Sequence, residues 1–363
     1  MKEIIHCIST ISLGGAEKQL FILVNEQLNL GHQVSVIYLK DKPELKKNFQ
    51  DAGAIVIDSL WGKKIFRQIY LLRKFLKEKD AVLHAHLPQA ELICALSKQK
   101  CTLVISKHNS EKFFPRANDL ISQVLARYVF YRSDLCISIS SAVQSFLIKI
   151  REIKDCNKLE VIHYGYSEID SPTIAEINDW KEKLKLKNEF VIGTIARMVS
   201  QKNYAVLLHS FRLFQQNHEN SKLLVIGDGI LREEIFALAR ELNIYNNIIW
   251  VRHTSAVPAL LSLMNVFVLT SNYEGFGLVL LESMARDIPV LASNNSSIPE
   301  VLGQNYPGLF HTGDFEDLAK LMKDCLHMEF YNKIKFESKN RLLNFDSRKM
   351  ALQILEAYKR INA

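Results

Sequence analysis

Two glutamates eight residues apart, Glu274 and Glu282, flank a glycine-rich turn. Gly275 and Gly277 would let a ligand approach the backbone, and a helix beginning near Gly277 would direct free N–H groups and its positive dipole end toward that ligand. Anions bind at a helix N-terminus, and carboxylates bind hydroxyl groups. The stretch therefore fits a phosphorylated sugar, or a nucleotide ribose with its phosphates. For the glutamate pair alone, an ordinary helix start is an equal alternative.

Two cationic residues, Arg197 and Lys202, follow the apolar run Phe190–Ile195. A planar guanidinium next to an ammonium group suits a diphosphate, whose charge must be stabilised as it leaves. The alternative for either residue alone is a surface ion pair. Together they predict a diphosphate site at the end of a strand.

Histidines lie at the ends of two more apolar runs, with His84 and His86 in one and His108 after Leu103–Ser106. A lone histidine is more often structural than catalytic. Residues just past the carboxyl ends of parallel strands, however, line the crevice where ligands bind. His86, His108 and the adjacent Asn109 are therefore candidates for contact with a substrate.

These residues need strands and helices to position them, and the chain alternates the two throughout. The order strand then helix predicts parallel sheets covered by helices, and it restarts after residue 185. We expect an α/β fold with two Rossmann-like, doubly wound domains that face a cleft. The expected strands of the first half are Glu3–Ser9, Val34–Leu39, Ile55–Ile57, Val82–Leu83, Leu103–Ser106, Leu135–Ser138 and Val161–Ile162. Those of the second are Phe190–Ile195, Lys222–Ile226, Ile248–Trp250, Val266–Leu269 and Val290–Ala292.

A length of 363 residues also favours two domains. We expect an N-terminal acceptor-binding domain over residues 1–166, a polar linker over 167–188 and a C-terminal nucleotide-sugar-binding domain over 189–345. The last segment, 346–363, is expected to be a helix that returns to the first domain.

Five ordered motifs resemble those of retaining glycosyltransferases of family 4, the group 1 glycosyl transferases with the GT-B fold. The resemblance covers nearly the whole chain. The motifs are Gly-Gly-Ala-Glu at 14–17, a histidine at 108, Gly-x-Ile-Ala-Arg at 193–197 with Lys-Asn at 202–203, Gly-Asp-Gly at 227–229, and Glu-Gly-Phe-Gly-Leu at 274–278 with the second glutamate at 282.

This resemblance implies a role for each matching residue. The catalytic residues would be His108, Glu274, Arg197 and Lys202. The donor-binding residues would be Gly14, Gly15, Gly227, Gly275, Phe276, Gly277, Leu278 and Glu282. His86 and Asn109 are acceptor-side candidates, and no metal is expected, since the chain has no Asp-x-Asp pair. The segment Val161–Tyr166 lacks the Asn and Asp of the family, and Ser293–Glu300 has hydroxyl side chains where the family has glycines.

The basic residues are concentrated in the first half, where residues 1–165 carry 24 Lys and Arg against 16 Asp and Glu. The stretch 61–79 carries Lys63, Lys64, Arg67, Arg73, Lys74 and Lys77 beside apolar residues spaced for one helix face. Packing of the apolar face on its own domain is the favoured interpretation, and docking of the cationic face on an anionic membrane is the alternative. No apolar run is long enough to span a bilayer, and six scattered cysteines are typical of reduced cytosolic thiols.

The expected activity is therefore retaining, metal-independent transfer of a hexosyl or N-acetylhexosaminyl unit, without a cofactor, from a nucleoside-diphosphate sugar. The resemblance favours a UDP-sugar over a GDP-sugar, and a saccharide or lipid-linked acceptor in cell-surface polysaccharide or lipopolysaccharide assembly. We expect a cytoplasmic protein, peripheral on the inner face of the cytoplasmic membrane, that does not bind nucleic acid. A nucleotide-sugar 2-epimerase of the same fold and a catalytically silent sugar-nucleotide-binding subunit are the alternatives.

Overall fold

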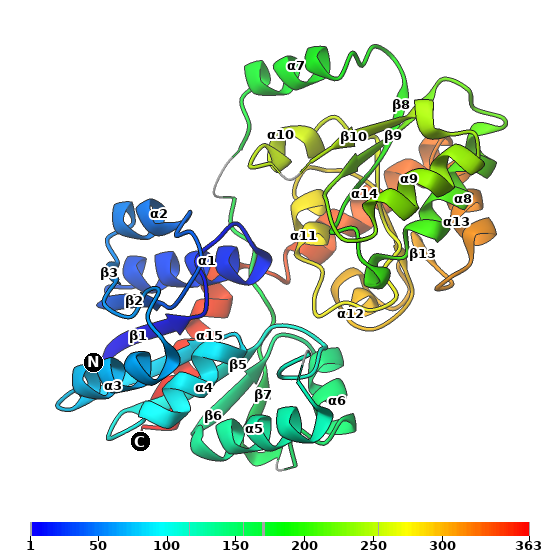
Figure 1. Ribbon diagram of the computed structural model, residues 1–363. Helices are drawn as coiled ribbons and strands as arrows, with labels where there is room; N and C mark the ends of the chain where they lie inside the picture. Colours follow the sequence, from blue (N-terminus) through cyan, green and yellow to red (C-terminus); the bar gives the residue numbers. More distant parts are fainter. Residues whose placement is uncertain (1, 116, 155, 169–170, 253, 363) are drawn as a thin grey trace. The chain divides into compact units, whose positions relative to one another are not determined.

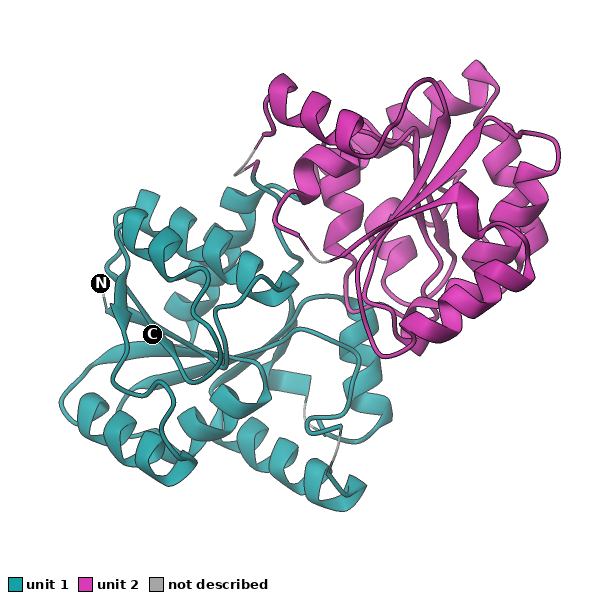
Figure 2. Cartoon of the chain, turned by 45° about the horizontal axis from the view of Figure 1, so that its top comes forward, with its two compact units in different colours: residues 1–167, 345–363 teal, residues 168–344 magenta. Residues whose placement is uncertain are grey.

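The computed structural model describes residues 2–115, 117–154, 156–168, 171–252 and 254–362. The chain forms two compact α/β units (Figures 1 and 2). Unit 1 contains residues 1–167 and 345–363, and unit 2 contains residues 168–344. Each has one parallel sheet, as the alternation of strands and helices in the sequence predicts. Arg116, one of the basic residues of the first half of the sequence, lies outside the described residues.

Unit 1 has a seven-stranded sheet in the order β3-β2-β1-β4-β5-β6-β7. Its strands are continuous apolar runs because both faces of the sheet are buried. They are β1 (Glu3–Ile8), β2 (Val34–Tyr38), β3 (Ile55–Ile57), β4 (Ala81–His86), β5 (Thr102–Lys107), β6 (Leu135–Ser138) and β7 (Leu159–Val161). Every neighbouring pair is parallel, and His6 of β1 lies opposite His84 of β4.

Helices cover both faces of this sheet. Those of unit 1 are α1 (Gly15–Asn29), α2 (Lys46–Asp51), α3 (Ile65–Leu76), α4 (Pro88–Ser97), α5 (Asp119–Arg132), α6 (Ser141–Lys149) and α15 (Ser347–Arg360). The C-terminal helix α15 packs beside α1 (Figure 1) and adds apolar side chains to the core formed by β1, β2 and β4. On the other face, α4 packs between α3 and α5.

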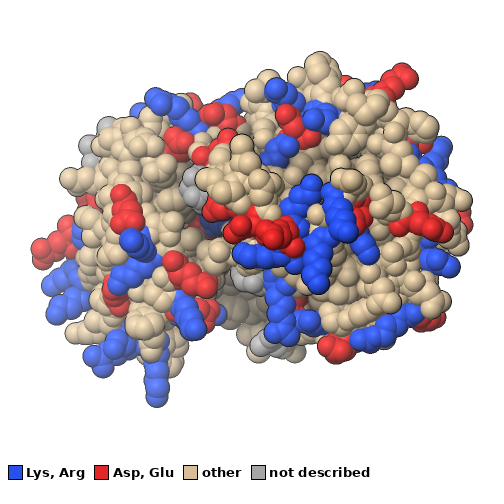
Figure 3. Space-filling view, turned by 90° about the horizontal axis from the view of Figure 1, so that it is seen from above, with Lys and Arg blue, Asp and Glu red and all other residues tan. Residues whose placement is uncertain are grey.

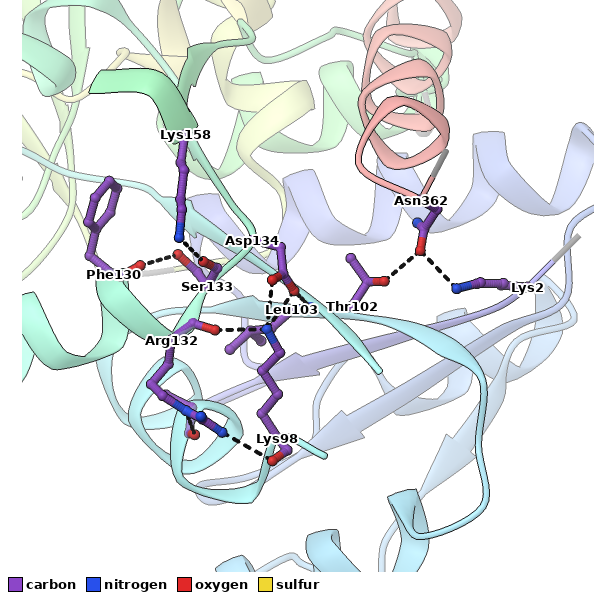
Figure 4. A network of polar contacts seen from close by, with 11 residues as sticks. Lys2, Lys98, Thr102, Leu103, Phe130, Arg132, Ser133, Asp134, Lys158 and Asn362 are labelled. Atoms are coloured by element: carbon purple, nitrogen blue, oxygen red, sulfur yellow. Dashed lines mark hydrogen bonds and ion pairs between the residues drawn. The ribbon is translucent and has the colours of Figure 1, made fainter. Parts of the chain in front are cut away.

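A polar network holds the amino-terminal edge of this sheet together (Figure 4). Lys98 Nζ contacts both carboxylate oxygens of Asp134 at 2.7 and 2.6 Å, and the second of these also accepts from the N–H of Leu103 at 2.8 Å. Nearby, Asn362 Oδ1 accepts from Thr102 and Lys2 at 2.5 and 2.9 Å, which fixes the end of α15. These contacts lie at the edge opposite to the carboxyl ends of the strands, so they stabilise the fold and leave the ligand edge to other residues.

Unit 2 has a six-stranded sheet in the order β10-β9-β8-β11-β12-β13. Its strands are β8 (Phe190–Ile195), β9 (Ser221–Ile226), β10 (Ile248–Val251), β11 (Val266–Leu269), β12 (Val290–Ser293) and β13 (Leu309–Phe310). Its α-helices are α7 (Ile174–Lys183), α8 (Tyr204–Gln215), α9 (Arg232–Glu241), α10 (Val257–Leu261), α11 (Leu278–Met284), α12 (Ile298–Leu302), α13 (Phe315–Asp324) and α14 (Met328–Leu342). Helix α7, which carries a complete capping box, lies inside the stretch that we expected to be a linker.

Helix α3 packs against α4 through part of its apolar stripe. Leu72 and Leu76 are buried and Ile69 and Phe75 are half-buried, so the favoured interpretation, packing of the apolar face on its own domain, is confirmed for these four residues, whereas Phe66 at the start of the helix is 83% exposed. A buried polar residue, Gln68, anchors the same helix, because its amide donates to the carbonyl oxygens of Leu39 and Leu60 at 3.0 Å each. Among the described residues, no helix is long and apolar enough to cross a bilayer.

Candidate active site

Each sheet has one point where the strand order reverses direction, and open α/β sheets bind ligands beside that point, at the carboxyl ends of the strands. In unit 2 the reversal lies between β8 and β11. The loop after β8 carries Arg197 and Lys202, and the loop after β11 carries Glu274. Strand order therefore brings together two sequence segments that are 72 residues apart.

Lys202 and Glu274 form an ion pair at this point. The distance from Lys202 Nζ to Glu274 Oε1 is 2.5 Å, and the two side chains are only 14% and 8% exposed. Ser271 Oγ donates to the same carboxylate oxygen at 2.6 Å. Arg197, by contrast, is exposed and has no ion-pair partner among the residues that the structure describes. The pair thus places a buried cation and a buried acceptor of hydroxyl groups side by side.

The turn that carries Glu274 is held by hydroxyl side chains. Ser296 and Ser297 donate to the carbonyl oxygen of Glu274 at 2.8 and 3.1 Å, and Ser293 donates to that of Ser271 at 2.6 Å. These serines lie in Ser293–Glu300, the stretch in which the resembling family has glycines. Their hydroxyls fix the backbone on both sides of the carboxylate, so Glu274 has little freedom to move.

The rest of the glycine-rich turn leads directly into α11. Gly277 is the residue before the helix and has φ 84°, a left-handed conformation that glycine adopts without strain. Gly275 and Phe276 are buried, whereas Leu278 and Glu282 are half-buried on the first turns of the helix. The expected helix start near Gly277 is therefore present, and both glutamates lie in the same loop-and-helix segment.

Gly227 follows β9, the strand next to β8. A Cβ atom at this position would lie 2.0 Å from the carbonyl oxygen of Ala196, so only glycine allows the two loops to meet. The N–H of Met198 donates to the carbonyl oxygen of Asp228 at 2.9 Å and joins the same loops. Gly227 therefore shapes the edge of the sheet next to Arg197.

In unit 1 the strand order reverses between β1 and β4. Gly14 and Gly15 lie at the start of α1, in the loop after β1. A Cβ atom on Gly14 would lie 2.2 Å from Glu17 Oε2, so the glycine makes room for this carboxylate. Glu17 is buried and accepts a hydrogen bond from the hydroxyl of Thr10.

His86 ends β4 on the other side of the reversal, and His108 follows β5, the next strand. His86 Nδ1 and His108 Nε2 are 3.1 Å apart, and His108 Nδ1 contacts the hydroxyl of Tyr164. Burial lowers the pKa of His108 to about 3 and that of His86 well below its usual range, so both rings are neutral at pH 7. Asn109 is exposed beside them, where its amide donates to Glu111 at 3.1 Å.

A small hollow lies beside His108 and Asn109, and its lining includes Glu91, Lys107 and Glu152. Lys107 and Glu91 form a buried ion pair of 2.5 Å. Burial lowers the pKa of Lys107, but the carboxylate of Glu91, together with Cys136 and Glu152, holds that pKa above its ordinary value. The ammonium group therefore stays charged and is neutralised inside unit 1.

Three buried histidines, His6, His84 and His86, have ring nitrogens within 4.8 Å of one another, a spacing that a metal ion would accept. The structure gives these nitrogens hydrogen-bond partners of their own. His84 contacts the hydroxyls of Tyr358 and Ser106 at 2.5 and 2.7 Å, and His6 contacts His86 and Gln27 at 3.0 and 2.8 Å. A metal ion would have to displace these contacts, so the geometry is that of a hydrogen-bond network.

The residues expected at the site thus fall into one set in each unit, at the ligand edge of each sheet. The sequence analysis did not identify Tyr164, His6 or the Lys107–Glu91 pair. His6 could have been identified, because it is a polar residue within an otherwise apolar strand. Nothing in the sequence alone indicated that Tyr164 would contact His108.

Comparison with known proteins agrees with this architecture. Residues 13–168 match the family described as Glycosyltransferase Family 4, and residues 176–342 match Glycosyl transferases group 1. A Campylobacter jejuni protein named N-acetylgalactosamine-N,N'-diacetylbacillosaminyl-diphospho-undecaprenol 4-alpha-N-acetylgalactosaminyltransferase is 24% identical over 96% of this chain and 97% of its own. A second, a GalNAc-alpha-(1->4)-GalNAc-alpha-(1->3)-diNAcBac-PP-undecaprenol alpha-1,4-N-acetyl-D-galactosaminyltransferase of the same organism, is 27% identical over 95% of both chains.

Solved structures share the fold over the full chain. HepE of Anabaena, in complex with UDP and glucose, has a TM-score of 0.84 at 19% identity and covers 99% of this chain and 100% of its own. TarM has a TM-score of 0.79 at 12% identity, with 100% and 99% covered. At these identities the likeness concerns the fold, which is that of the GT-B glycosyltransferases.

Proposed function

The chain belongs to the group 1 glycosyl transferases of glycosyltransferase family 4, and on that premise we propose that it is a retaining, metal-independent transferase. Its donor would be a UDP-sugar with a hexosyl or N-acetylhexosaminyl unit, and its acceptor a lipid-linked saccharide in surface-polysaccharide assembly. Two observations on similar proteins support the substrate classes. HepE was solved with UDP-glucose, and the two Campylobacter relatives are named for acceptors that carry diphospho-undecaprenol.

The observation that carries the proposal is the Lys202–Glu274 pair beside the strand reversal of unit 2. In the proposed reaction Lys202 and Arg197 stabilise the charge of the departing diphosphate, and Glu274 accepts hydrogen bonds from hydroxyls of the donor sugar. Glu282, in the second turn of α11, would accept hydrogen bonds from the ribose hydroxyls. Lys202 already contacts Glu274 in the absence of ligand. When the donor binds, a contact between Lys202 and the diphosphate would replace part of this ion pair.

Gly14, Gly15 and His108 would serve the reaction from unit 1. The turn at Gly14 would approach the diphosphate, and His108, with His86 and Asn109, would orient the sugar and the acceptor. His108 is neutral at pH 7 because burial lowers its pKa to about 3. It is therefore a poor proton acceptor, and the leaving phosphate itself would take the proton of the acceptor hydroxyl.

The exposed side of α3 supports a membrane-bound acceptor. Phe66 and Tyr70 are 83% and 64% exposed and lie four residues apart on one helix face. Lys63, Arg67 and Lys74 are exposed next to them. A surface that combines exposed apolar rings with cations fits the interface of an anionic bilayer.

Helix α5, on the other side of α4, has an exposed apolar face as well. Its exposed side chains are Leu120, Ile121, Val124, Tyr128 and Tyr131. Elsewhere the surface mixes both signs of charge, as Figure 3 shows for one face of the molecule. We propose that the side of unit 1 formed by α3 and α5 rests on the cytoplasmic face of the membrane, where lipid-linked acceptors are found.

A donor screen tests the proposed activity. Purified protein is melted with UDP-, GDP-, ADP- and TDP-sugars, and nucleotide release is then measured with an undecaprenyl-diphosphate-linked saccharide in the presence of chelator. We expect a shift of several degrees with one UDP-sugar and acceptor-dependent release that the chelator does not reduce. The anomeric configuration of the product, read by NMR, must match that of the donor.

Three other results would contradict the proposal. Conversion of the donor to its 2-epimer without acceptor would identify an epimerase. A thermal shift with one donor that is never followed by nucleotide release, even with acceptor present, would favour a silent sugar-nucleotide-binding subunit. Loss of activity with chelator, restored by a divalent metal, would exclude metal-independent transfer.

A further inference from the structure

Histidines from three neighbouring strand segments lie on one face of the sheet of unit 1. His6 on β1 pairs in register with His84 on β4, and His86 pairs with Ser106 on β5. Because side chains alternate between faces, His86 and His108 point to the same side as His6. This is the side that α1 and α15 cover, which places Gln27 of α1 against the same group.

The side chains on this face form a continuous chain of contacts. His6 Nε2 is 2.8 Å from Gln27 Oε1, and His6 Nδ1 is 3.0 Å from His86 Nε2. His86 Nδ1 is 3.1 Å from His108 Nε2, and His108 Nδ1 contacts the hydroxyl of Tyr164. Each link between rings joins Nδ1 of one histidine to Nε2 of the next, so the three rings are arranged head to tail.

Neutral histidines in such a chain must all share one tautomer. Burial lowers the pKa of His6 to about 4 and that of His108 to about 3, so each ring has one N–H donor and one acceptor nitrogen at pH 7. Gln27 Oε1 can only accept, so His6 carries its proton on Nε2. His6 Nδ1 then accepts from His86 Nε2, and His86 Nδ1 accepts from His108 Nε2.

The direction of the chain decides what Tyr164 does. Since the proton of His108 is on Nε2, its Nδ1 must accept, and the hydroxyl of Tyr164 must donate to it. A Gln27 amide turned to present its N–H would reverse every bond, and Tyr164 would then accept from His108. A side chain on the outer helix α1 therefore fixes the orientation of a hydroxyl proton three rings away.

Tyr164 lies close to the residues that the proposed reaction uses. Burial raises its pKa well above the ordinary value, and the nearby carboxylate of Glu17 raises it further. Glu17 belongs to the Gly14–Glu17 turn, and His108 is the residue expected beside the donor sugar. In the resembling family, the Val-Ile-Pro-Asn-Gly segment has asparagine at this position, so the tyrosine is a feature of this chain.

We propose that Gln27, His6 and His86 are positioning residues, which hold His108 as the Nε2–H tautomer and turn the hydroxyl of Tyr164 onto His108 Nδ1. The effect on catalysis rests on the proposed transfer, whereas the tautomers do not depend on it. Both ring nitrogens of His108 are engaged inside unit 1. His108 therefore orients substrate through its position and through Tyr164, and it does not act as the general base.

NMR of protein labelled with ¹⁵N-histidine tests the inference without any substrate. At pH 7.5 we expect His6, His86 and His108 each as the neutral Nε2–H form. Gln27→Leu removes the acceptor at the end of the chain and should give His108 as a mixture of both tautomers, whereas Gln27→Glu keeps an acceptor and should keep the Nε2–H form. His86→Phe, which breaks the chain but keeps a ring, should change His108 in the same way as Gln27→Leu.

His84→Phe is the matched control, because His84 is equally buried, its ring nitrogens contact only hydroxyls outside the chain, and phenylalanine keeps a ring next to His86. It should leave the spectrum of His108 unchanged. If transfer is established, His86→Phe should lower kcat about 10-fold or more with little change in KM for the donor.

Three results would overturn the inference. They are an Nδ1–H form of His108 in the wild-type protein, a His108 spectrum that neither Gln27→Leu nor His86→Phe alters, and stoichiometric zinc whose removal shifts the signals of His6 and His86. Failure to find a donor would leave these tautomers unaffected and would contradict the proposed function alone.

Discussion

The Lys202–Glu274 pair can be tested by a double-mutant cycle in the absence of ligand. Lys202→Met removes the ammonium group and leaves a carboxylate that is only 8% exposed without its counter-ion. Removing one partner of a buried ion pair costs about 3–5 kcal/mol, and we expect the lower end, about 3 kcal/mol, because Ser271 still donates to Glu274. For a unit of this size, that loss corresponds to a fall in Tm of roughly 6–12 °C.

The double variant Lys202→Met/Glu274→Gln should recover most of this stability. The amide of glutamine can still accept from Ser271, and no buried charge remains without a partner. The measurement is the urea midpoint of unit 2, read by hydrogen exchange of peptides from β8 and β11, with peptides from β1 as the internal control. We expect a coupling energy of about 2 kcal/mol between the two sites.

If the double variant were no more stable to urea than the less stable single variant, the proposed coupling between Lys202 and Glu274 would be wrong. The cycle also sharpens the test of catalysis. Because the double variant is expected to be folded, its failure to release nucleotide from a UDP-sugar would report lost chemistry, which a single alanine substitution cannot separate from lost stability.

Two further predictions concern unit 1. Acidification from pH 7 to 5 should destabilise it by about 2 kcal/mol for each of His6 and His108, since the unfolded chain binds protons near pH 6.5 but the folded chain does so only near pH 4 and 3. This contribution to the stability of unit 1 is fully present above pH 6.5 and is lost as the pH falls. It is measured as the urea midpoint of peptides from β1 and β4 at each pH. His311→Gln, at an exposed position, should leave the pH dependence of that midpoint unchanged. Phe66→Ser/Tyr70→Ser should weaken binding to anionic vesicles about 10-fold or more, with Ile174→Ser as the exposed control in unit 2, and binding that stays unchanged would contradict the membrane surface.

Much of the fold could be predicted from the sequence because most strands are continuous apolar runs. β2, β8 and β11 fall within a residue of the expected bounds. The two-residue strand β13 was missed, because Leu309 and Phe310 are too short a run to form a pattern. The burial of Gln68 in α3 could not be predicted either, since it depends on carbonyl groups of Leu39 and Leu60 that the chain brings to this side chain only after folding.

The candidate site could be predicted as residue types, and its contacts could not. Glycines and charged residues after apolar runs indicated Lys202 and Glu274 separately. Their contact depends on the pairing of β8 with β11, and this pairing cannot be read from the order of the strands in the sequence. The histidine chain depends in the same way on the register between β1 and β4. His84 and His86 alone indicated only polar positions near a strand end.

The two units bring different chemistry to the ligand edges of their sheets. In unit 2 the edge carries charge, with Lys202 against Glu274 and Arg197 exposed nearby. In unit 1 the histidines are neutral, because burial lowers the pKa of each, and Lys107 is neutralised by Glu91. A diphosphate needs cations, whereas sugar hydroxyls need neutral donors and acceptors in fixed directions. The ligand edge of unit 2 therefore suits a diphosphate, and the ligand edge of unit 1 suits sugar hydroxyl groups.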